Sequence, residues 1–286
     1  IPWGTHWIIG TTDTDWNLDL AHPAASKADI DYLLAHVNSA LTNPITHDDI
    51  QGVYAGLRPL LSGEDEQTSQ LSREHAVARP QPGLISIAGG KYTTYRVMAA
   101  DAIDAAREDI GPGVADSVTE HIPLLGADGY PALMNQLDRL SRKHDLPVWR
   151  LTHLLGRYGS LVHELFDLLA ADPSLAEPLP GAEEYLKVEI VYGATHEGAL
   201  HLDDLLARRT RISIETPSRG VDSAQAAADL VAPVLGWDAA RVAREVDLYR
   251  GRVEAERESQ QAPDDQEANA ERTSARDARI WADADG

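Results

Sequence analysis

The chain has 286 residues, of which 46 are acidic and 25 basic, so its formal net charge is −21. Its length and its 43% of apolar residues suffice for roughly two globular domains with hydrophobic cores. The sequence has no cysteine, which excludes disulfides, thiolate metal sites and cysteine nucleophiles. The acidic balance argues against nucleic acid or anionic lipid as a partner, since both favour Lys and Arg, and no apolar run approaches the roughly 20 residues of a membrane-spanning helix.

Strands and helices alternate in the first part of the chain. Ser26 with Asp29 predicts a capping box at the start of a helix, whose apolar face recurs at helical spacing from Ile30 onward. A second helix is predicted over about 91–109. Segments typical of strands lie at 6–10, 49–58, 74–79 and 84–88. Residues 1–115 are therefore predicted to form an α/β domain, a mixed sheet with helices.

The pattern changes after Gly111, where Gly and Pro interrupt it. From residue 130 to about residue 258, leucines and valines recur almost throughout at the spacing of one helix face, which predicts a small all-α domain over 116–258. The last segment, 259–286, is polar, acidic and poor in apolar residues, and this composition predicts a disordered tail.

Several common site motifs are missing from the sequence. It has no GxGxxG, no Walker loop and no GxSxG elbow. His196 and His201 are five residues apart, which places their rings about 140° apart on a helix, too far around it for a shared metal ion. No metal site is predicted.

The segment IAGGKYTTYR, residues 87–96, is the first candidate site. A buried strand, two glycines and a helix start would place unpaired backbone N–H groups and the positive end of the helix dipole together. Gly89 and Gly90 would let a ligand approach the backbone, and Lys91 and Thr93 add a cation and a hydroxyl. This arrangement suits an anion or an electron-rich carbonyl. The alternative is a tight turn with Lys91 in solvent and threonines capping the helix.

Two arginines form the second candidate site. Arg58 follows an apolar segment and precedes a proline, and Arg73 lies at a similar strand edge in LSREH. Two guanidinium groups could clamp a phosphate or carboxylate. The alternative is a pair of structural ion pairs with the many acidic residues nearby.

Four motifs in this order closely resemble the downstream half of FAD-dependent glycerol-3-phosphate dehydrogenases, within the D-amino-acid-oxidase-like flavoproteins. The motifs are GTTDTDW (10–16), YAGLRPLL (54–61), SREH (72–75) and IAGGKYTTYR (87–96). Residues 184–211 resemble the family's helical end domain, so the similarity spans about residues 1–255. The resemblance implies FAD-mediated oxidation of glycerol 3-phosphate to dihydroxyacetone phosphate, with a quinone as electron acceptor.

The resemblance also implies residue roles. Arg58 and Arg73 would hold the substrate, and Lys91 would face it over the flavin. Gly89, Gly90, Lys91 and Thr93 would contact the flavin ring, and Asp128 corresponds only loosely to a family glutamate near the site.

This sequence departs from the family in one major respect. Nothing in it corresponds to the family's upstream GxGxxG region, and it begins at Ile1 rather than Met, so a C-terminal fragment with little activity and poor FAD binding by itself is expected. Two alternatives remain: another amino- or hydroxy-acid oxidase of the same flavoprotein group, and a non-catalytic helical interaction module. A cytoplasmic location with peripheral membrane contact is expected, for which the basic segment 205–211 is a candidate patch, and self-association is a further expectation.

Overall fold

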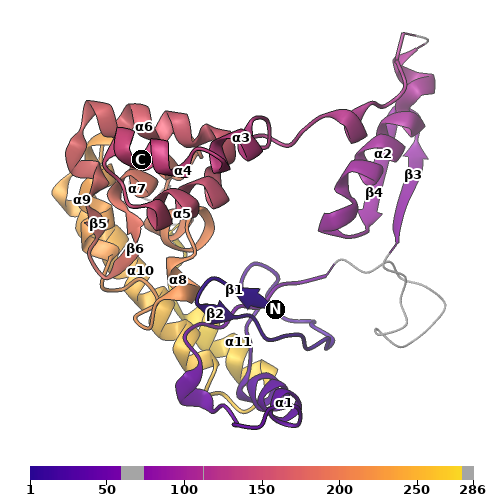
Figure 1. Cartoon of the computed structure of the whole chain (residues 1–286). Coiled ribbons are helices and arrows are strands. Elements are labelled where there is room, and N and C mark those ends of the chain that lie inside the picture. The colour runs from indigo at the N-terminus through magenta and orange to yellow at the C-terminus, as the bar shows by residue number, and fades with distance from the viewer. Residues whose placement is uncertain (59–73, 112, 279–286) are drawn as a thin grey trace. The chain divides into compact units, whose positions relative to one another are not determined.

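The computed structural model of the chain describes residues 1–58, 74–111 and 113–278. These residues divide into two compact units (Figure 1). The first unit comprises residues 1–12, 18–55 and 126–286, and the second comprises residues 13–17 and 56–125. Each is described by itself.

The first unit is predominantly helical. Its N-terminal part contains the hairpin β1 (Pro2–Trp3) and β2 (His6–Trp7), helix α1 (Lys27–Asn38) and the 3-10 turn η1 (His47–Asp49). Its helical part begins with α3 (Tyr130–Met134), α4 (Leu137–His144), α5 (Val148–Tyr158), η5 (Gly159–Leu161), α6 (Val162–Ala171) and η6 (Pro173–Ala176). A two-stranded sheet of β5 (Pro178–Leu179) and β6 (Ala182–Leu186) precedes α7 (Lys187–Thr195). The π-helix η7 (Asp204–Arg209), α8 (Ile212–Glu215), α9 (Ala224–Leu235), α10 (Ala239–Ser259) and α11 (Asp265–Ser274) complete it.

Two adjoining apolar clusters form the core of this helical part. The first surrounds Leu151, Leu154 and Leu165 and joins α3 to α7, and the second surrounds Leu205 and Tyr249 and joins α7 to α10. Burial of each such side chain contributes about 1.5–3 kcal/mol. The apolar periodicity from residue 130 onward therefore arises because these helices share a core, which confirms the prediction of helices there.

The N-terminal part of the first unit packs on its C-terminal helices. Trp3 donates from Nε1 to Glu215 at 2.8 Å, and the amide of Asp19 donates to the side chain of Asn269 at 3.2 Å. Gly52 lies so close to α8 that a Cβ added to it would be 2.6 Å from the Cα of Ile214. Residues far apart in the sequence thus stabilise one another within this unit.

The second unit is a hairpin covered by one helix. Strands β3 (His75–Gln81) and β4 (Leu84–Gly89) pair antiparallel, with His75 opposite Gly89, and the 3-10 turn η3 (Tyr92–Thr94) leads into α2 (Tyr95–Ile110) (Figure 1). A further 3-10 turn, η4 (Thr119–His121), follows. His75 Nε2 lies 2.7 Å from Asp101, and Arg79 donates to Asp109 at 3.0 Å, so ion pairs hold α2 to one face of the hairpin.

The secondary structure agrees with the sequence where the signals are local. Strands at 74–79 and 84–88 and a helix from about residue 91 are confirmed, and Ser26 begins α1 with the expected capping box to Asp29. The predicted strand over 49–58 is wrong, because residues 50–58 find no strand to pair with in the described chain, and Gly52 lies against the backbone of Ile214 instead.

The fold-class prediction is met only in part. In the described residues each sheet has two antiparallel strands. Residues 1–115 therefore contain two separate hairpins where a mixed sheet was expected, and most of the remaining described chain is helical. The disorder expected over 259–286 does not hold for residues 265–274, which form α11. Asp264 caps this helix, and Ala268 is fully buried, so packing on α10 orders a segment whose composition is polar. The predicted domain limits at 115, 116 and 258 remain predictions.

Candidate functional site

The turn between β4 and α2 brings four of the predicted site residues together. Gly89 and Gly90 have φ angles of 76° and 79°, a backbone conformation that side chains with a Cβ rarely adopt. A Cβ on Gly90 would also be 2.6 Å from the sulfur of Met98 on α2. Paired glycines are required here because the chain reverses direction directly against the helix that follows.

The start of α2 leaves backbone donors at this turn. The amide of Thr94 donates to the carbonyl of Lys91 at 3.0 Å, and the Thr94 hydroxyl donates to the same carbonyl at 3.0 Å. The amides of Tyr92 and Thr93 open the turn, where no preceding helical carbonyl is in position to accept from them. Lys91 and Thr93 have exposed side chains. The turn therefore presents backbone N–H groups and one ammonium group, a donor set that suits an anion or an electron-rich carbonyl.

Arg58 has a carboxylate partner. Its Nη1 lies 2.8 Å from Oδ2 of Asp13, and both side chains are partly exposed. The two residues come from YAGLRPLL and GTTDTDW, two of the motifs that carry the family resemblance. An ion pair of the kind considered from sequence is thus present. It engages Nη1 of Arg58, whereas a guanidinium group has five N–H donors in all. Arg73 lies outside the described residues.

One neighbour of the turn was not singled out from sequence. His75 ends SREH, lies opposite Gly89 in the hairpin, and has its Cβ 3.1 Å from where a Cβ on Gly90 would be. Its ring contacts Asp101 on α2 at 2.7 Å, so it connects the turn to the helix. The signal available in the sequence was its place at the end of a family motif. Asp128 lies in the first unit, exposed in the turn before α3.

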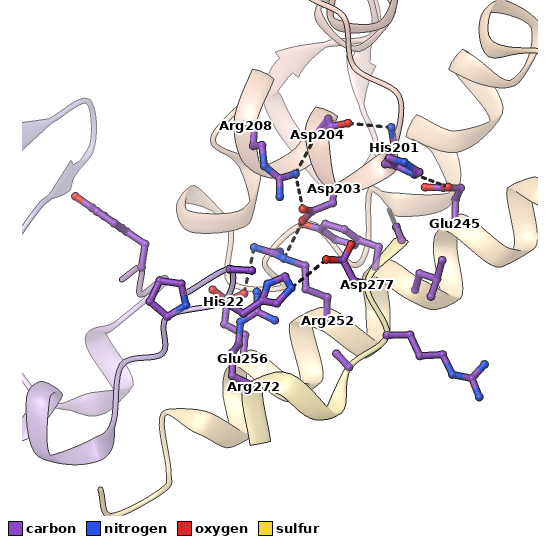
Figure 2. Close-up of a pocket in the computed structure, with 18 of the residues that line it drawn as sticks. His22, His201, Asp203, Asp204, Arg208, Glu245, Arg252, Glu256, Arg272 and Asp277 are labelled. Atoms are coloured by element: carbon purple, nitrogen blue, oxygen red, sulfur yellow. Dashed lines mark hydrogen bonds and ion pairs between the residues drawn. The ribbon is translucent and has the colours of Figure 1, made fainter. Parts of the chain in front are cut away.

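A second polar cluster lies in the first unit and lines a cavity of about 210 Å³ (Figure 2). Arg252 contacts Asp203 at 2.8 Å and Glu256 at 3.5 Å, and Arg208 contacts both Asp203 and Asp204. His201 Nδ1 lies 3.0 Å from Glu245, and this hydrogen bond raises the pKa of His201. Opposite charges alternate throughout the cluster, so these contacts hold η7 to α10.

The basic segment 205–211 takes part in these internal contacts. Leu205 and Leu206 are fully buried in the core, and Arg209 donates to the carbonyl of Glu197 at 2.7 Å. Arg211 lies over the ring of Trp3, 4.2 Å from its centroid. The two leucines of this segment therefore offer no apolar surface for a membrane.

A third polar cluster surrounds a completely buried carboxylate. Glu189 on α7 accepts from the amide of Leu186 at 2.8 Å, and its Oε1 lies 3.0 Å from His153 and 3.2 Å from Arg157. Tyr158 donates its hydroxyl to the same oxygen at 3.3 Å. Burial and the charge of Glu189 raise the pKa of Tyr158, so the phenol stays protonated and remains a donor. Three donors and one ion pair on a single carboxylate are typical of a structural centre that joins α5 to α7.

The described residues show neither a metal cluster nor a membrane span. In residues 1–58, 74–111 and 113–278, three or more His, Asp or Glu side chains nowhere gather as they would around a metal ion. Among the helices that the structure describes, none has the length and apolar character to cross a bilayer.

Comparison with known proteins finds that the chain is similar to glycerol phosphate enzymes. Residues 117–242 match the C-terminal domain of alpha-glycerophosphate oxidase. The chain is 63% identical over 279 residues to glycerol-3-phosphate dehydrogenase 2 of Mycobacterium bovis and 61% identical to the glycerol-3-phosphate dehydrogenase of Mycobacterium leprae, and each match covers 98% of this chain and 48% of the relative. The crystal structure of the glycerol-3-phosphate dehydrogenase from Bacillus halodurans complexed with FAD is similar with a TM-score of 0.68 and 26% identity, over 86% of this chain and 48% of that one. The chain therefore spans about half the length of these relatives.

Proposed function

Because this chain belongs to the glycerol-3-phosphate dehydrogenase family, we propose that it takes part in the oxidation of glycerol 3-phosphate to dihydroxyacetone phosphate with FAD as cofactor. The observation that carries the proposal is the β4–α2 turn. It combines Gly89 and Gly90 at positive φ with an exposed Lys91 at the start of a helix, inside the region of similarity.

The proposed substrate is an anion, and the proposed site supplies cations to a protein of net charge −21. Arg58 and Arg73 would bind the phosphate and hydroxyl groups, because guanidinium groups match phosphate oxygens in pairs. Binding the phosphate, which does not react, would position the reacting C2 carbon. Lys91 would face the substrate from the turn and favour negative charge on its oxygen. Asp13, 2.8 Å from Arg58, would orient that guanidinium group.

The residues at the turn fit a flavin ring. Gly89 and Gly90 carry no side chain to obstruct it, and the opening amides of η3, together with Thr93 and Lys91, would donate to its polar edge near N1 and the C2 carbonyl. When bound, FAD would supply the hydride acceptor. The protein's part is to hold the ring and the substrate in register and to provide a positive field at that edge.

The proposal also covers the electron acceptor, the cellular location of the protein and its self-association. Family resemblance supports a quinone as the electron acceptor, and with it a cytoplasmic protein that contacts the membrane peripherally. Self-association is proposed on the same ground. Because segment 205–211 has its leucines buried, any membrane contact would use another surface.

The proposal is tested in a chimera in which this chain replaces the matching part of the Mycobacterium bovis relative. We expect glycerol-3-phosphate-dependent dye reduction with bound FAD. Lys91→Ala and Arg58→Ala should each lower kcat/KM by more than about tenfold, or roughly 1.4 kcal/mol of transition-state binding. Arg58→Lys should restore little, because an ammonium group cannot bind two phosphate oxygens in the same fork geometry.

Two outcomes would contradict the proposal. A chimera that contains FAD but oxidises amino or hydroxy acids in preference to glycerol 3-phosphate would assign the chain to another oxidase of this group. Unchanged activity in both alanine variants would instead favour a non-catalytic helical module. Asp138→Ala, at an exposed position on α4 of the first unit, is the control that should leave kcat/KM unchanged.

A further inference from the structure

Arg272 is a guanidinium group that lacks a direct partner in the described chain. It lies on α11 and lines the cavity of about 210 Å³ in the first unit, which η7 and α10 also border (Figure 2). No residue in 1–58, 74–111 or 113–278 forms a hydrogen bond or an ion pair with it. Its side chain is largely buried, and this burial lowers the pKa of Arg272. A buried charge without a direct partner is unfavourable, so Arg272 is a donor that still needs an acceptor.

Arg252 contributes a second unsatisfied donor to the same cavity. Its Nε lies 2.8 Å from Asp203 and its Nη2 lies 3.5 Å from Glu256. Its Nη1 is buried and has no hydrogen-bond partner among the residues that the structure describes. Arg272 lies near both Glu256 and Arg252, and the like charge of Arg252 acts on it (Figure 2). Unpaired buried donors are rare in native proteins, and here two of them come from neighbouring guanidinium groups.

The carboxylates of the cavity already have partners. Asp203 contacts both Arg208 and Arg252, and Glu245 lies 3.0 Å from His201. The remaining acidic residues that line the cavity are also paired, namely Asp204 with Arg208, Glu256 with Arg252 and Asp277 with His22. Opposite charges are therefore close to balance around the cavity, but the groups left over are hydrogen-bond donors. Such a space suits an anion rather than a cation.

We propose that this cavity binds a small phosphate-type oxyanion, either inorganic phosphate or the phosphate group of a small monoester, between Arg252 and Arg272. Phosphate offers several acceptor oxygens, and guanidinium groups match these oxygens in pairs. The volume limits the size of the ligand. A cavity of about 210 Å³ has room for several water molecules but is smaller than the roughly 300–1,000 Å³ that drug-sized ligands occupy, so it suits a small anion rather than a nucleotide.

A phosphate at this position would join two helices. Arg252 belongs to α10 and Arg272 to α11, so one ligand would bind both and strengthen the packing of α11 on α10. Among the described residues, neither Arg58 nor any member of the β4–α2 turn lines this cavity. The inference therefore concerns a site made of other residues than those proposed for the substrate and the flavin, and it does not depend on the proposed function.

Thermal unfolding of the full chain measures this binding. Inorganic phosphate is compared with chloride at equal ionic strength, since general screening of charges would act in both. At a phosphate concentration about tenfold above its Kd, binding to the folded chain should raise Tm by about 3–5 °C. Isothermal titration calorimetry should detect a single phosphate site per chain.

Arg272→Met removes the guanidinium group and keeps an unbranched apolar side chain. In chloride this variant should be at least as stable as the unaltered chain, because it removes a buried charge that has no direct partner. In phosphate the rise in Tm and the calorimetric site should disappear. Arg250→Met is the matched control, since Arg250 lies on α10 with a side chain that is 53% exposed and does not line the cavity, and it should retain both.

Glycerol 3-phosphate added in place of phosphate distinguishes the two sources of the ligand. A rise in Tm that requires Arg272 and is larger with glycerol 3-phosphate would identify a monoester, and an equal or smaller rise would identify inorganic phosphate.

Three results would overturn the inference. Equal Tm values in phosphate and chloride would show that the cavity does not bind the anion. An equal phosphate effect in the unaltered chain and in Arg272→Met would show that phosphate acts elsewhere on the protein. A Tm of Arg272→Met in chloride that is clearly below that of the unaltered chain would show that Arg272 stabilises the fold without a ligand.

Discussion

Replacing Glu189 with Gln tests whether the buried carboxylate cluster holds the helical domain together. The substitution keeps the volume of the side chain but removes a fully buried charge. That carboxylate accepts from His153, Tyr158 and the amide of Leu186 and forms an ion pair with Arg157. Arg157 is itself largely buried, so its guanidinium group would lose the carboxylate that compensates its charge. Removing one member of a buried ion pair costs about 3–5 kcal/mol.

The expected loss is about 3 kcal/mol, at the lower end of that range, because the amide oxygen of Gln can still accept from the backbone of residue 186. For a protein of this size each kcal/mol lowers Tm by about 2–4 °C, so Tm should fall by about 6–12 °C. Thermal and urea unfolding, followed by far-UV circular dichroism, measure this. Glu184→Gln on the neighbouring strand is exposed and should change the free energy of unfolding by about 0.5 kcal/mol or less.

A double-mutant cycle with Arg157→Gln identifies the source of the loss. If the pair interacts as its 3.2 Å contact implies, the two substitutions together should cost less than the sum of the single ones by roughly 1–3 kcal/mol. A loss under about 1 kcal/mol for Glu189→Gln, or strict additivity with Arg157→Gln, would refute the idea that this carboxylate organises α5 and α7.

Three further predictions concern other contacts. Glu245 raises the pKa of His201, so an NMR titration should place the midpoint above the ordinary 6.5 and Glu245→Gln should lower it; the stability from this pair is complete below pH 6.5 and disappears as pH rises through the folded pKa. Gly90→Ala should destabilise the hairpin by about 1–2 kcal/mol, because a residue with a Cβ is strained at a φ of 79°. Faster hydrogen exchange of the amides in β3 and β4 measures this loss. Adding Met98→Ala should relieve only the steric contact between the new Cβ and the Met98 side chain, so the loss that comes from φ should remain. Truncation after residue 263 should lower Tm, because α11 packs on α10, whereas an unchanged Tm and rapid proteolysis of 265–274 in the full chain would support a disordered tail.

The features predicted correctly depend on residues close together in the sequence. The capping box of Ser26 and Asp29 and the hairpin leading into α2 each require only neighbouring residues and local hydrogen bonds. The glycines at 89 and 90 likewise produced a turn at positive φ, because few other residues adopt that backbone. Site residues on this turn could be grouped from sequence for the same reason, whereas the partner of Arg58, Asp13, could not, because it lies 45 positions earlier.

The features missed depend on contacts between distant segments. The polar composition of α11 favours disorder, yet Asp19 donates to Asn269 across 250 positions and the amide of Lys27 donates to Ala262 at 2.9 Å. Glu189 appeared to be an ordinary polar residue, because its partners on α5 are 31 or more positions away. His201 was weighed only as a metal ligand, because its partner Glu245 lies 44 positions away. No local pattern identifies such a cluster, since each member is stable only when the others are already in place.

The sequence by itself determined the helical character of the C-terminal domain, the glycine turn before α2 and, through four ordered motifs, the family. These follow from periodicity, backbone preference and residue identity, all of which are local properties. The tertiary structure decided which charges are buried and paired and that α11 is ordered. Those outcomes depend on which surfaces meet when the chain packs, and the free energy of that packing comes from groups that the sequence keeps far apart.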